Sequence, residues 1–280
     1  REGMETVKYL LPVRLGECSH ESVALRDEIC YFKIGITYTN PVITFSSAAD
    51  PTVIRTEDGF YLYATQTDKY WVPIYFSKDL VNWEFKRTAF RNATKPQIPG
   101  GGAFWAPEIR HINGKYVLYF SWAKWGDGDA SYTAVATSDS PLGDFVNSKE
   151  LLTKEDFGSN CIDQFYYEED NKKYMFVGSF NGIYVTELTD DGLSVKRNEN
   201  GTPTLKKQVC GKAFEGTNIY KKNGYYYLFA SINNCCDGER SRYKVVVGRS
   251  QDLLGPYLDK SGKDMINNAW ELVLEGDGQK

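Results

Sequence analysis

Four residues of the chain could carry chemistry, and they recur at one position of a sequence repeat. Each repeat unit contains a tyrosine-rich run, and aligning these runs superimposes Tyr61, Tyr116, Tyr174 and Tyr226. Eleven residues before these tyrosines stand, in order, Asp50, Trp105, Asp163 and Glu215. Three carboxylic acids and one tryptophan therefore occupy equivalent positions in four successive units.

Such a set of side chains would suit the hydrolysis of a glycosidic bond. One carboxyl group protonates the leaving oxygen, while another activates a water or attacks directly. A third acid nearby raises the pKa of its neighbour by repulsion between like charges, which keeps a proton available near neutral pH. Trp105 would offer a flat face to a sugar ring. The same spacing also fits acids that only hydrate a tunnel or bind an ion, because clustered acids mark functional sites only as a tendency.

The spacing of these residues predicts the elements that position them. The four positions are 55, 58 and 52 residues apart, and a unit of this length that holds four short strands is one blade of a β-propeller. Asn113-Gly114 and Asn223-Gly224 are hairpin turn signals between strand-like runs. The first strand of each blade lines the central axis, so Asp50, Asp163 and Glu215 are expected to face one another at one end of it.

A second repeated feature supports this interpretation. Three segments begin with a serine, continue through a turn-forming pair and end in an aromatic residue: 77–83, 138–145 and 250–257. Each follows a strand-like run in its own unit. We expect each of them to be the turn after the third strand of a blade.

The repeat accounts for most of the chain, but for only four blades. The sequence predicts an irregular amino-terminal segment over 1–38 and a propeller domain over 39–280 with about four recognisable blades. His20 lies eleven residues before Tyr31, at the offset of the repeated position. The sequence leaves open whether the ring is closed by four blades or has a fifth that is incomplete or supplied by 1–38.

Composition narrows the class of protein. The 280 residues are 41% hydrophobic and 15% aromatic, with 20 tyrosines and 6 tryptophans, which suits strand-rich packing. A net charge of −4 provides no basic field for a nucleic acid. No apolar run reaches the roughly 20 residues that cross a bilayer. Motifs of nucleophilic serine or cysteine enzymes, phosphate-binding loops and HExxH metalloproteases are also missing from the sequence.

The six cysteines do not identify a zinc site or a disulfide scaffold. Their spacing matches neither, so free buried thiols are the expectation. The adjacent pair Cys235 and Cys236 is unusual, because a bond between them closes a strained eight-membered ring. The compartment is therefore not decided by cysteine usage.

Five short motifs, in order and at blade spacing, resemble glycoside hydrolase family 43. They are Ala49-Asp50-Pro51, Trp105-Ala-Pro-Glu108, Asn160-Cys-Ile-Asp163, Phe214-Glu215-Gly216 and Val247-Gly-Arg-Ser250. The resemblance covers about residues 38–276 and implies an all-β fold: a five-bladed propeller of four-stranded blades, whose fifth blade is incomplete in this chain. Residues 235–243 and the stretch after them look most like arabinanases and related arabinofuranosidases.

Carried over position by position, the resemblance assigns roles to six residues. Asp50 resembles the general base, Glu215 the general acid, and Asp163 the acid that orients Glu215. Trp105 looks like part of the sugar-binding wall, and Asn160 and Ser179 match positions near the substrate. The family inverts the anomeric centre, which requires base and acid carboxyl groups roughly 6.5–9.5 Å apart. Chemistry of this kind needs no cofactor. The resemblance also allows a structural Ca²⁺ on the propeller axis, but no metal ligand is identified in this chain.

Three functions remain open at this point. The first is an inverting glycosidase that cleaves α-L-arabinofuranosyl linkages in arabinan or in arabinose-decorated plant polysaccharide. The second is a β-xylosidase acting on xylo-oligosaccharides, and the third is a sugar-binding propeller without catalysis. The expected partner is an oligo- or polysaccharide and neither a nucleic acid nor a membrane. The expected location is outside the cytoplasm, secreted or periplasmic.

Overall fold

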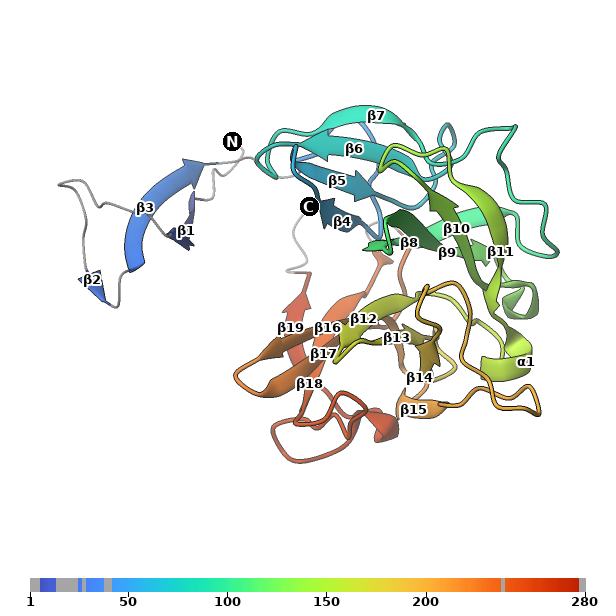
Figure 1. Ribbon diagram of the computed structural model, residues 1–280. Helices are drawn as coiled ribbons and strands as arrows, with labels where there is room; N and C mark the ends of the chain where they lie inside the picture. Colours follow the sequence, from blue (N-terminus) through green and yellow to red (C-terminus); the bar gives the residue numbers. More distant parts are fainter. Residues whose placement is uncertain (1–5, 14–24, 27–28, 38–41, 238–239, 277–280) are drawn as a thin grey trace.

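The fold consists mainly of four sheets, each with four antiparallel strands, arranged side by side as the blades of a propeller (Figure 1). The computed structural model describes residues 6–13, 25–26, 29–37, 42–237 and 240–276, with side chains in the last two ranges. The predicted all-β propeller with four-stranded blades is confirmed. Four blades are present among the described residues, and the expected fifth blade is not among them.

The strands of each blade follow one another along the chain, from the axis outward. Blade 1 consists of β4 (Thr52–Arg55), β5 (Phe60–Tyr63), β6 (Pro73–Ser77) and β7 (Glu84–Thr88). Blade 2 consists of β8 (Ala103–Ile112), β9 (Lys115–Ala123), β10 (Tyr132–Ser138) and β11 (Val146–Leu152). Blade 3 consists of β12 (Phe165–Glu169), β13 (Lys172–Val177), β14 (Ile183–Leu188) and β15 (Lys207–Cys210). Blade 4 consists of β16 (Phe214–Lys222), β17 (Tyr225–Ile232), β18 (Lys244–Ser250) and β19 (Glu271–Glu275).

Short helical turns occur only in the connections of the described chain. They are η1 (Gly128–Ala130), α1 (Lys154–Phe157) and η3 (Met265–Asn267). In the part of the chain that the structure describes, no helix has the length and apolar character needed to span a membrane.

The hairpins between the first two strands of blades 2 and 4 form at the predicted Asn-Gly pairs. Asn113 and Gly114 have φ angles of 49° and 77°, and Asn223 and Gly224 have φ angles of 51° and 76°. Two successive left-handed residues twist the backbone in the sense that antiparallel strands require, and asparagine and glycine tolerate this conformation best.

The three serine-led segments lie where the sequence predicts them, after the third strand of blades 1, 2 and 4. β6, β10 and β18 end at Ser77, Ser138 and Ser250, respectively. Each of these serine hydroxyls accepts a hydrogen bond from the backbone N–H two residues later, at 3.0–3.1 Å. The side chain thus holds the turn that sends the chain to the outer strand.

Apolar clusters join each blade to the next, except between blade 4 and blade 1. One cluster combines blades 1 and 2 around Phe90 and Phe104. A second joins blades 2 and 3 around Tyr119 and Tyr166, and a third joins blades 3 and 4. The fourth cluster lies within blade 1 and its lead-in. Among the described residues, no cluster combines blade 4 with blade 1, so the ring has one open junction.

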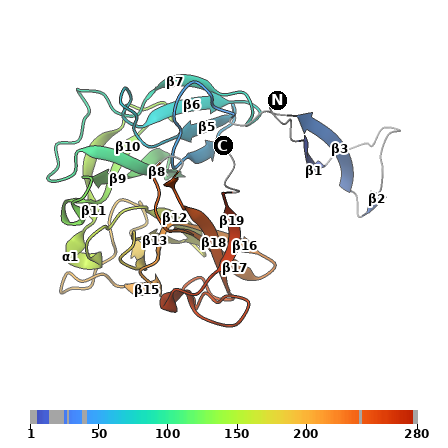
Figure 2. The same cartoon turned by 180° about the vertical axis from the view of Figure 1, so that it is seen from behind.

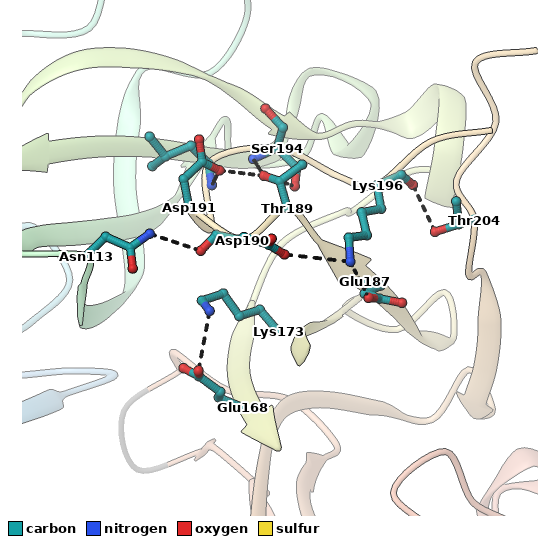
Figure 3. A network of polar contacts seen from close by, with 11 residues as sticks. Asn113, Glu168, Lys173, Glu187, Thr189, Asp190, Asp191, Ser194, Lys196 and Thr204 are labelled. Carbon is teal, nitrogen blue, oxygen red and sulfur yellow. Dashed lines mark hydrogen bonds and ion pairs between the residues drawn. The ribbon is translucent and has the colours of Figure 1, made fainter. Parts of the chain in front are cut away.

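Polar contacts tie blade 3 to the hairpin turn of blade 2 (Figure 3). Asn113 Nδ2 donates to the backbone oxygen of Asp190 at 3.2 Å, and Lys196 bridges Glu187 at 2.8 Å and Asp190 at 3.8 Å. The hydroxyl of Tyr119 donates to the backbone oxygen of Gly192 at 2.9 Å. The contacts of Asn113 and Tyr119 hold the two blades together, and the ion pairs of Lys196 lie within blade 3.

The described amino-terminal strands form a separate sheet. β1 (Thr6–Val13), β2 (Leu25–Arg26) and β3 (Ile29–Thr37) pair in the order β1-β3-β2, and Figure 2, like Figure 1, places this sheet to one side of the four blades. These strands lie within the amino-terminal segment 1–38, which the sequence predicts to be irregular. His20 lies outside the described residues.

The cysteines follow the expectation only in part. Cys161 and Cys210 are free and buried, as expected. Cys235 and Cys236 are joined in a disulfide, so the expectation of free thiols is wrong for this pair. The bond lies in the loop between β17 and β18.

Candidate active site

The three repeated acids lie at the same end of three innermost strands. Asp50 stands two residues before β4, Asp163 stands two residues before β12, and Glu215 is the second residue of β16. Asp50 is exposed, Asp163 is half-buried, and Glu215 is only 8% exposed. The site therefore offers one acid in contact with solvent and two that are largely shielded from it.

Asp163 connects the three acids electrostatically. Burial raises the pKa of Asp163 well above its usual range, and the negative charges of Glu215 and Asp50 raise it further. The backbone N–H of Gly216 opposes this rise in the pKa of Asp163. The expected convergence of the three acids is thus present, because the charges of Glu215 and Asp50 both act on Asp163.

Two hydroxyl groups hold the carboxyl group of Glu215. Ser179 Oγ donates to Glu215 Oε2 at 2.7 Å, and Tyr243 Oη donates to Glu215 Oε1 at 2.6 Å. Ser179 follows β13 in blade 3, whereas Tyr243 directly precedes β18 in blade 4. The orientation of Glu215 is therefore fixed both from its own blade and from blade 3.

Asp50 is held by a residue of its own blade, which also contacts the next one. Thr65 Oγ1 donates to Asp50 Oδ2 at 2.6 Å and accepts from the backbone N–H of Ala106 at 2.8 Å. Ala106 follows Trp105 in β8. A single threonine hydroxyl therefore links the candidate base to the strand that carries the tryptophan.

A left-handed backbone conformation occurs at the repeated position or at the next residue in all four blades. Asp50 and Asp163 have φ angles of 49° and 57°. In blades 2 and 4 the left-handed residue is the next one, Ala106 at 40° and Gly216 at 62°. Non-glycine residues rarely adopt this conformation, and it concentrates at functional sites. The two blades with the shifted position also share a β-bulge at this point of the first strand.

Trp105 forms part of an aromatic surface beside the acids. Its ring lies 5.9 Å from that of Trp125 at an interplanar angle of 72°, and Trp125 is 76% exposed. Trp125 belongs to the loop between β9 and β10. The backbone N–H of Asn160 donates to the backbone oxygen of Gly128 in this loop at 2.9 Å.

Asn160 and Ser179 adjoin each other, since the N–H of Ser179 donates to the backbone oxygen of Asn160 at 3.2 Å. A Cβ atom on Gly128 would lie 2.5 Å from Asn160 Oδ1. Glycine at position 128 thus permits the loop to lie against Asn160. The structure brings together the predicted set of three acids, Trp105, Asn160 and Ser179 through these strands and this loop.

Comparison with known proteins identifies the family. The sequence model of the glycosyl hydrolases family 43 matches residues 38–279. The chain belongs to glycosyl hydrolase family 43.

Individual relatives and solved structures agree with this family. The chain is 30% identical to an extracellular endo-α-(1→5)-L-arabinanase of Bacillus subtilis, over 82% of this chain and 73% of that protein. It is 31% identical to an extracellular exo-α-(1→5)-L-arabinofuranosidase of Cellvibrio japonicus, over 81% and 71%. The structure of Cellvibrio cellulosa α-L-arabinanase complexed with arabinohexaose matches with a TM-score of 0.69 and 29% identity, over 83% of this chain and 79% of that one. Native Bacillus subtilis arabinanase matches with a TM-score of 0.67 and 28% identity, over 84% and 82%.

Several residues of this family 43 site were not singled out from the sequence. Thr65, Ser121 and Tyr243 contact the repeated acids, and Ser121 Oγ accepts from the backbone N–H of Asp163 at 3.1 Å. A signal for the first two was present, because each repeat unit ends in a hydroxyl residue: Thr65, Ser121, Ser179 and Ser231. No comparable signal marks Tyr243, which lies outside the repeat.

A fourth acid of the sequence motifs, Glu108, is buried away from the three. Thr52 Oγ1 donates to Glu108 Oε2 at 2.9 Å, the backbone N–H of Tyr166 donates to Oε1 at 3.3 Å, and Arg110 pairs with it at 2.5 Å. Burial raises the pKa of Glu108, although Arg110 and the hydrogen bonds oppose this. Glu108 thus connects the inner strands of blades 1, 2 and 3.

The structural Ca²⁺ ion that the resemblance allows remains a prediction. Among residues 42–237 and 240–276, no three His, Cys, Asp or Glu side chains gather in a way that could hold a metal ion. We therefore derive no step through a metal.

Proposed function

We propose that the chain is an inverting glycosidase that cleaves α-L-arabinofuranosyl linkages in arabinan or in arabinose-decorated plant polysaccharide. The observation that carries this proposal is the gathering of Asp50, Asp163 and Glu215 at one end of three inner strands. Glycoside hydrolysis by inversion needs a base that reaches water and an acid that holds a proton. An exposed Asp50 and a shielded Asp163–Glu215 pair match these two requirements.

In the proposed mechanism, Asp50 takes a proton from a water while that water attacks the anomeric carbon. Glu215 gives a proton to the leaving glycosidic oxygen, so the bond to that oxygen breaks as the bond to water forms. The proton comes from the Asp163–Glu215 pair. The raised pKa of Asp163 favours a proton on this pair in the free site.

The choice of arabinan rests on the related proteins. Two relatives at 30% and 31% identity are named as an arabinanase and an arabinofuranosidase, and one matching structure is described as bound to arabinohexaose. Trp105 is proposed to form the wall of the sugar site, with Asn160 and Ser179 near the substrate. The half-buried Trp105 next to the exposed Trp125 supports this, because sugar rings bind to aromatic faces.

The test is release of reducing sugar from linear arabinan and from xylan, with the wild-type protein and Glu215→Ala in parallel. We expect release from arabinan that is abolished in the variant. Release mainly from xylan would select the β-xylosidase alternative. Saturable binding of arabino-oligosaccharide without any release would select a sugar-binding propeller and overturn the proposal.

We also propose that the complete ring has five blades. The open junction between blades 4 and 1 supports this, as do the exposed apolar residues of β19, Leu272, Val273 and Leu274, at 45%, 49% and 65%. The boundary near residue 38 remains a prediction. Deletion of residues 1–37 tests it: unchanged unfolding and activity would separate this segment from the propeller, and a large loss of stability would assign it to the ring.

We further propose that the protein acts outside the cytoplasm and that its chemistry needs no cofactor. The two relatives named above are called extracellular, and the Cys235–Cys236 disulfide suits an oxidising compartment. Dialysis against a chelator tests the second proposal. Activity should survive it, and a loss that calcium restores would contradict it.

A further inference from the structure

We infer that Tyr243 is a positioning residue for Glu215, which sets the orientation and the proton affinity of the proposed acid through its phenolic hydroxyl. This inference rests on the function proposed above. Tyr243 lies outside the repeated motifs, and the sequence analysis assigns it no role.

Tyr243 acts as a hydrogen-bond donor to the proposed acid, because its Oη donates to Glu215 Oε1 at 2.6 Å. Ser231 lies beside Tyr243 and partly offsets the rise in the pKa of its hydroxyl. Burial, followed by the charge of Glu215, raises the pKa of Tyr243. Tyr243 therefore keeps its proton and acts as a donor across the working pH range.

The loop before Tyr243 is closed at its base, which fixes the position of the ring. Asn233 Nδ2 donates to the backbone oxygen of Arg242 at 3.1 Å, and Ser241 Oγ donates to the backbone oxygen of Asn234 at 2.8 Å. On the β17–β18 ladder, Ser231 pairs with Val245, two residues after Tyr243. The hydroxyl thus reaches Glu215 from a tightly held strand end.

Each of the two hydroxyl donors affects both the orientation and the charge of Glu215. Ser179 and Tyr243 each bind one oxygen of Glu215, so loss of either leaves the carboxyl group free to turn about one remaining contact. A donor also stabilises the charged form of a carboxylate. Removal of the Tyr243 hydroxyl should therefore make the acid hold its proton more firmly and deliver it from a less well fixed position.

Tyr243→Phe tests this inference, because it removes one oxygen and leaves the ring. The matched control is Tyr226→Phe in the same blade, since Tyr226 also donates to a glutamate, Glu169, but at the other end of the β16–β17 ladder. Both variants are assayed for kcat and kcat/KM between pH 4 and pH 10. The substrates are arabino-oligosaccharide and an aryl arabinofuranoside whose leaving group needs little protonation.

For Tyr243→Phe we expect the basic limb of the kcat/KM profile to move to higher pH by about one unit, the scale of one hydrogen bond to a charged group. We also expect kcat on the oligosaccharide to fall about tenfold and kcat on the aryl substrate to fall much less, because general acid catalysis contributes little there. Tyr226→Phe should change neither.

Equal losses on both substrates with an unmoved basic limb would make Tyr243 a packing residue and overturn the inference. So would a wild-type profile in Tyr243→Phe. If the wild-type protein itself releases no sugar, the proposed function fails and the inference falls with it. Ser179→Ala is a second test. Removal of this other donor to Glu215 should move the basic limb of the kcat/KM profile in the same direction.

Discussion

The carboxyl group of Asp163 lies close enough to that of Glu215 for the charge of Glu215 to raise the pKa of Asp163, although the two residues belong to different blades. Neither side chain could hold this arrangement alone, because the chain that joins them crosses a whole blade. The ring of inner strands brings them together, and the pKa of Asp163 rises as a result of burial and of the neighbouring charges.

Replacement of Asp163 by Asn should separate the stability of the site from its chemistry. A carboxyl group whose pKa is raised by folding stabilises the folded state at low pH, and this stabilisation is lost as pH rises through the raised pKa. Asn carries no charge at any pH. The unfolding temperature of Asp163→Asn relative to wild type should therefore be higher at pH 8 than at pH 4, while kcat on arabinan falls by about 100-fold.

Thermal unfolding at the two pH values measures this difference. Asp68→Asn, at an exposed position, is the control. Its unfolding temperature should differ from that of the wild type by the same amount at pH 4 and at pH 8. If the difference in unfolding temperature between Asp163→Asn and the wild type does not depend on pH, the raised pKa of Asp163 is contradicted.

Thr65 should be required for its hydroxyl rather than for its shape. It donates to Asp50 and accepts from the backbone of Ala106, so Thr65→Val leaves both groups without this partner. We expect kcat/KM on arabinan to fall about tenfold, with a loss of about 1 kcal/mol in the free energy of unfolding.

Thr65→Ser keeps the hydroxyl and should retain most of the activity. Measurements of kcat/KM and of urea unfolding on Thr65→Val and Thr65→Ser in parallel show whether the hydroxyl or the shape of the side chain is required. Equal activity in Val and Ser variants would show that the hydroxyl does not position the base.

Glu108 should contribute to stability across three blades rather than to catalysis. Glu108→Ala leaves Thr52, Arg110 and the N–H of Tyr166 without their common partner, and it should lower the free energy of unfolding by about 3 kcal/mol. Glu84→Ala removes an acid that pairs at the surface with Lys86 and should have no measurable effect. Urea unfolding compares the two. A Glu108→Ala variant as stable as Glu84→Ala would refute the structural role.

Much of the fold could be predicted from the sequence, because its signals are local. Asn-Gly pairs favour the left-handed backbone of a hairpin turn. In the serine-led turns, the serine hydroxyl accepts a hydrogen bond from a backbone N–H. Both patterns therefore mark the ends of strands. The repeated acids follow from counting back from the tyrosines. Equivalent positions of the innermost strands lie at the same distance from the propeller axis. The same count therefore also predicts that the three acids converge.

Other features depend on contacts between distant segments and have no local signature. Tyr243 reaches Glu215 from a loop that the repeat does not describe. The Cys235–Cys236 disulfide contradicts an expectation taken from average cysteine behaviour. Glu108 belongs to one of the sequence motifs, but its side chain is 8% exposed and paired with Arg110. The position of a carboxylate in the chain does not reveal which groups surround it.

The most direct test of the proposed chemistry is the configuration of the sugar at the moment of release. Proton NMR spectra, recorded within the first minutes of arabino-oligosaccharide hydrolysis, distinguish the two anomers before they interconvert, with Glu215→Gln as the inactive control. Inversion of an α linkage predicts that the β-anomer of the arabinofuranosyl product appears first. Initial release of the α-anomer would contradict an inverting site built from Asp50, Asp163 and Glu215.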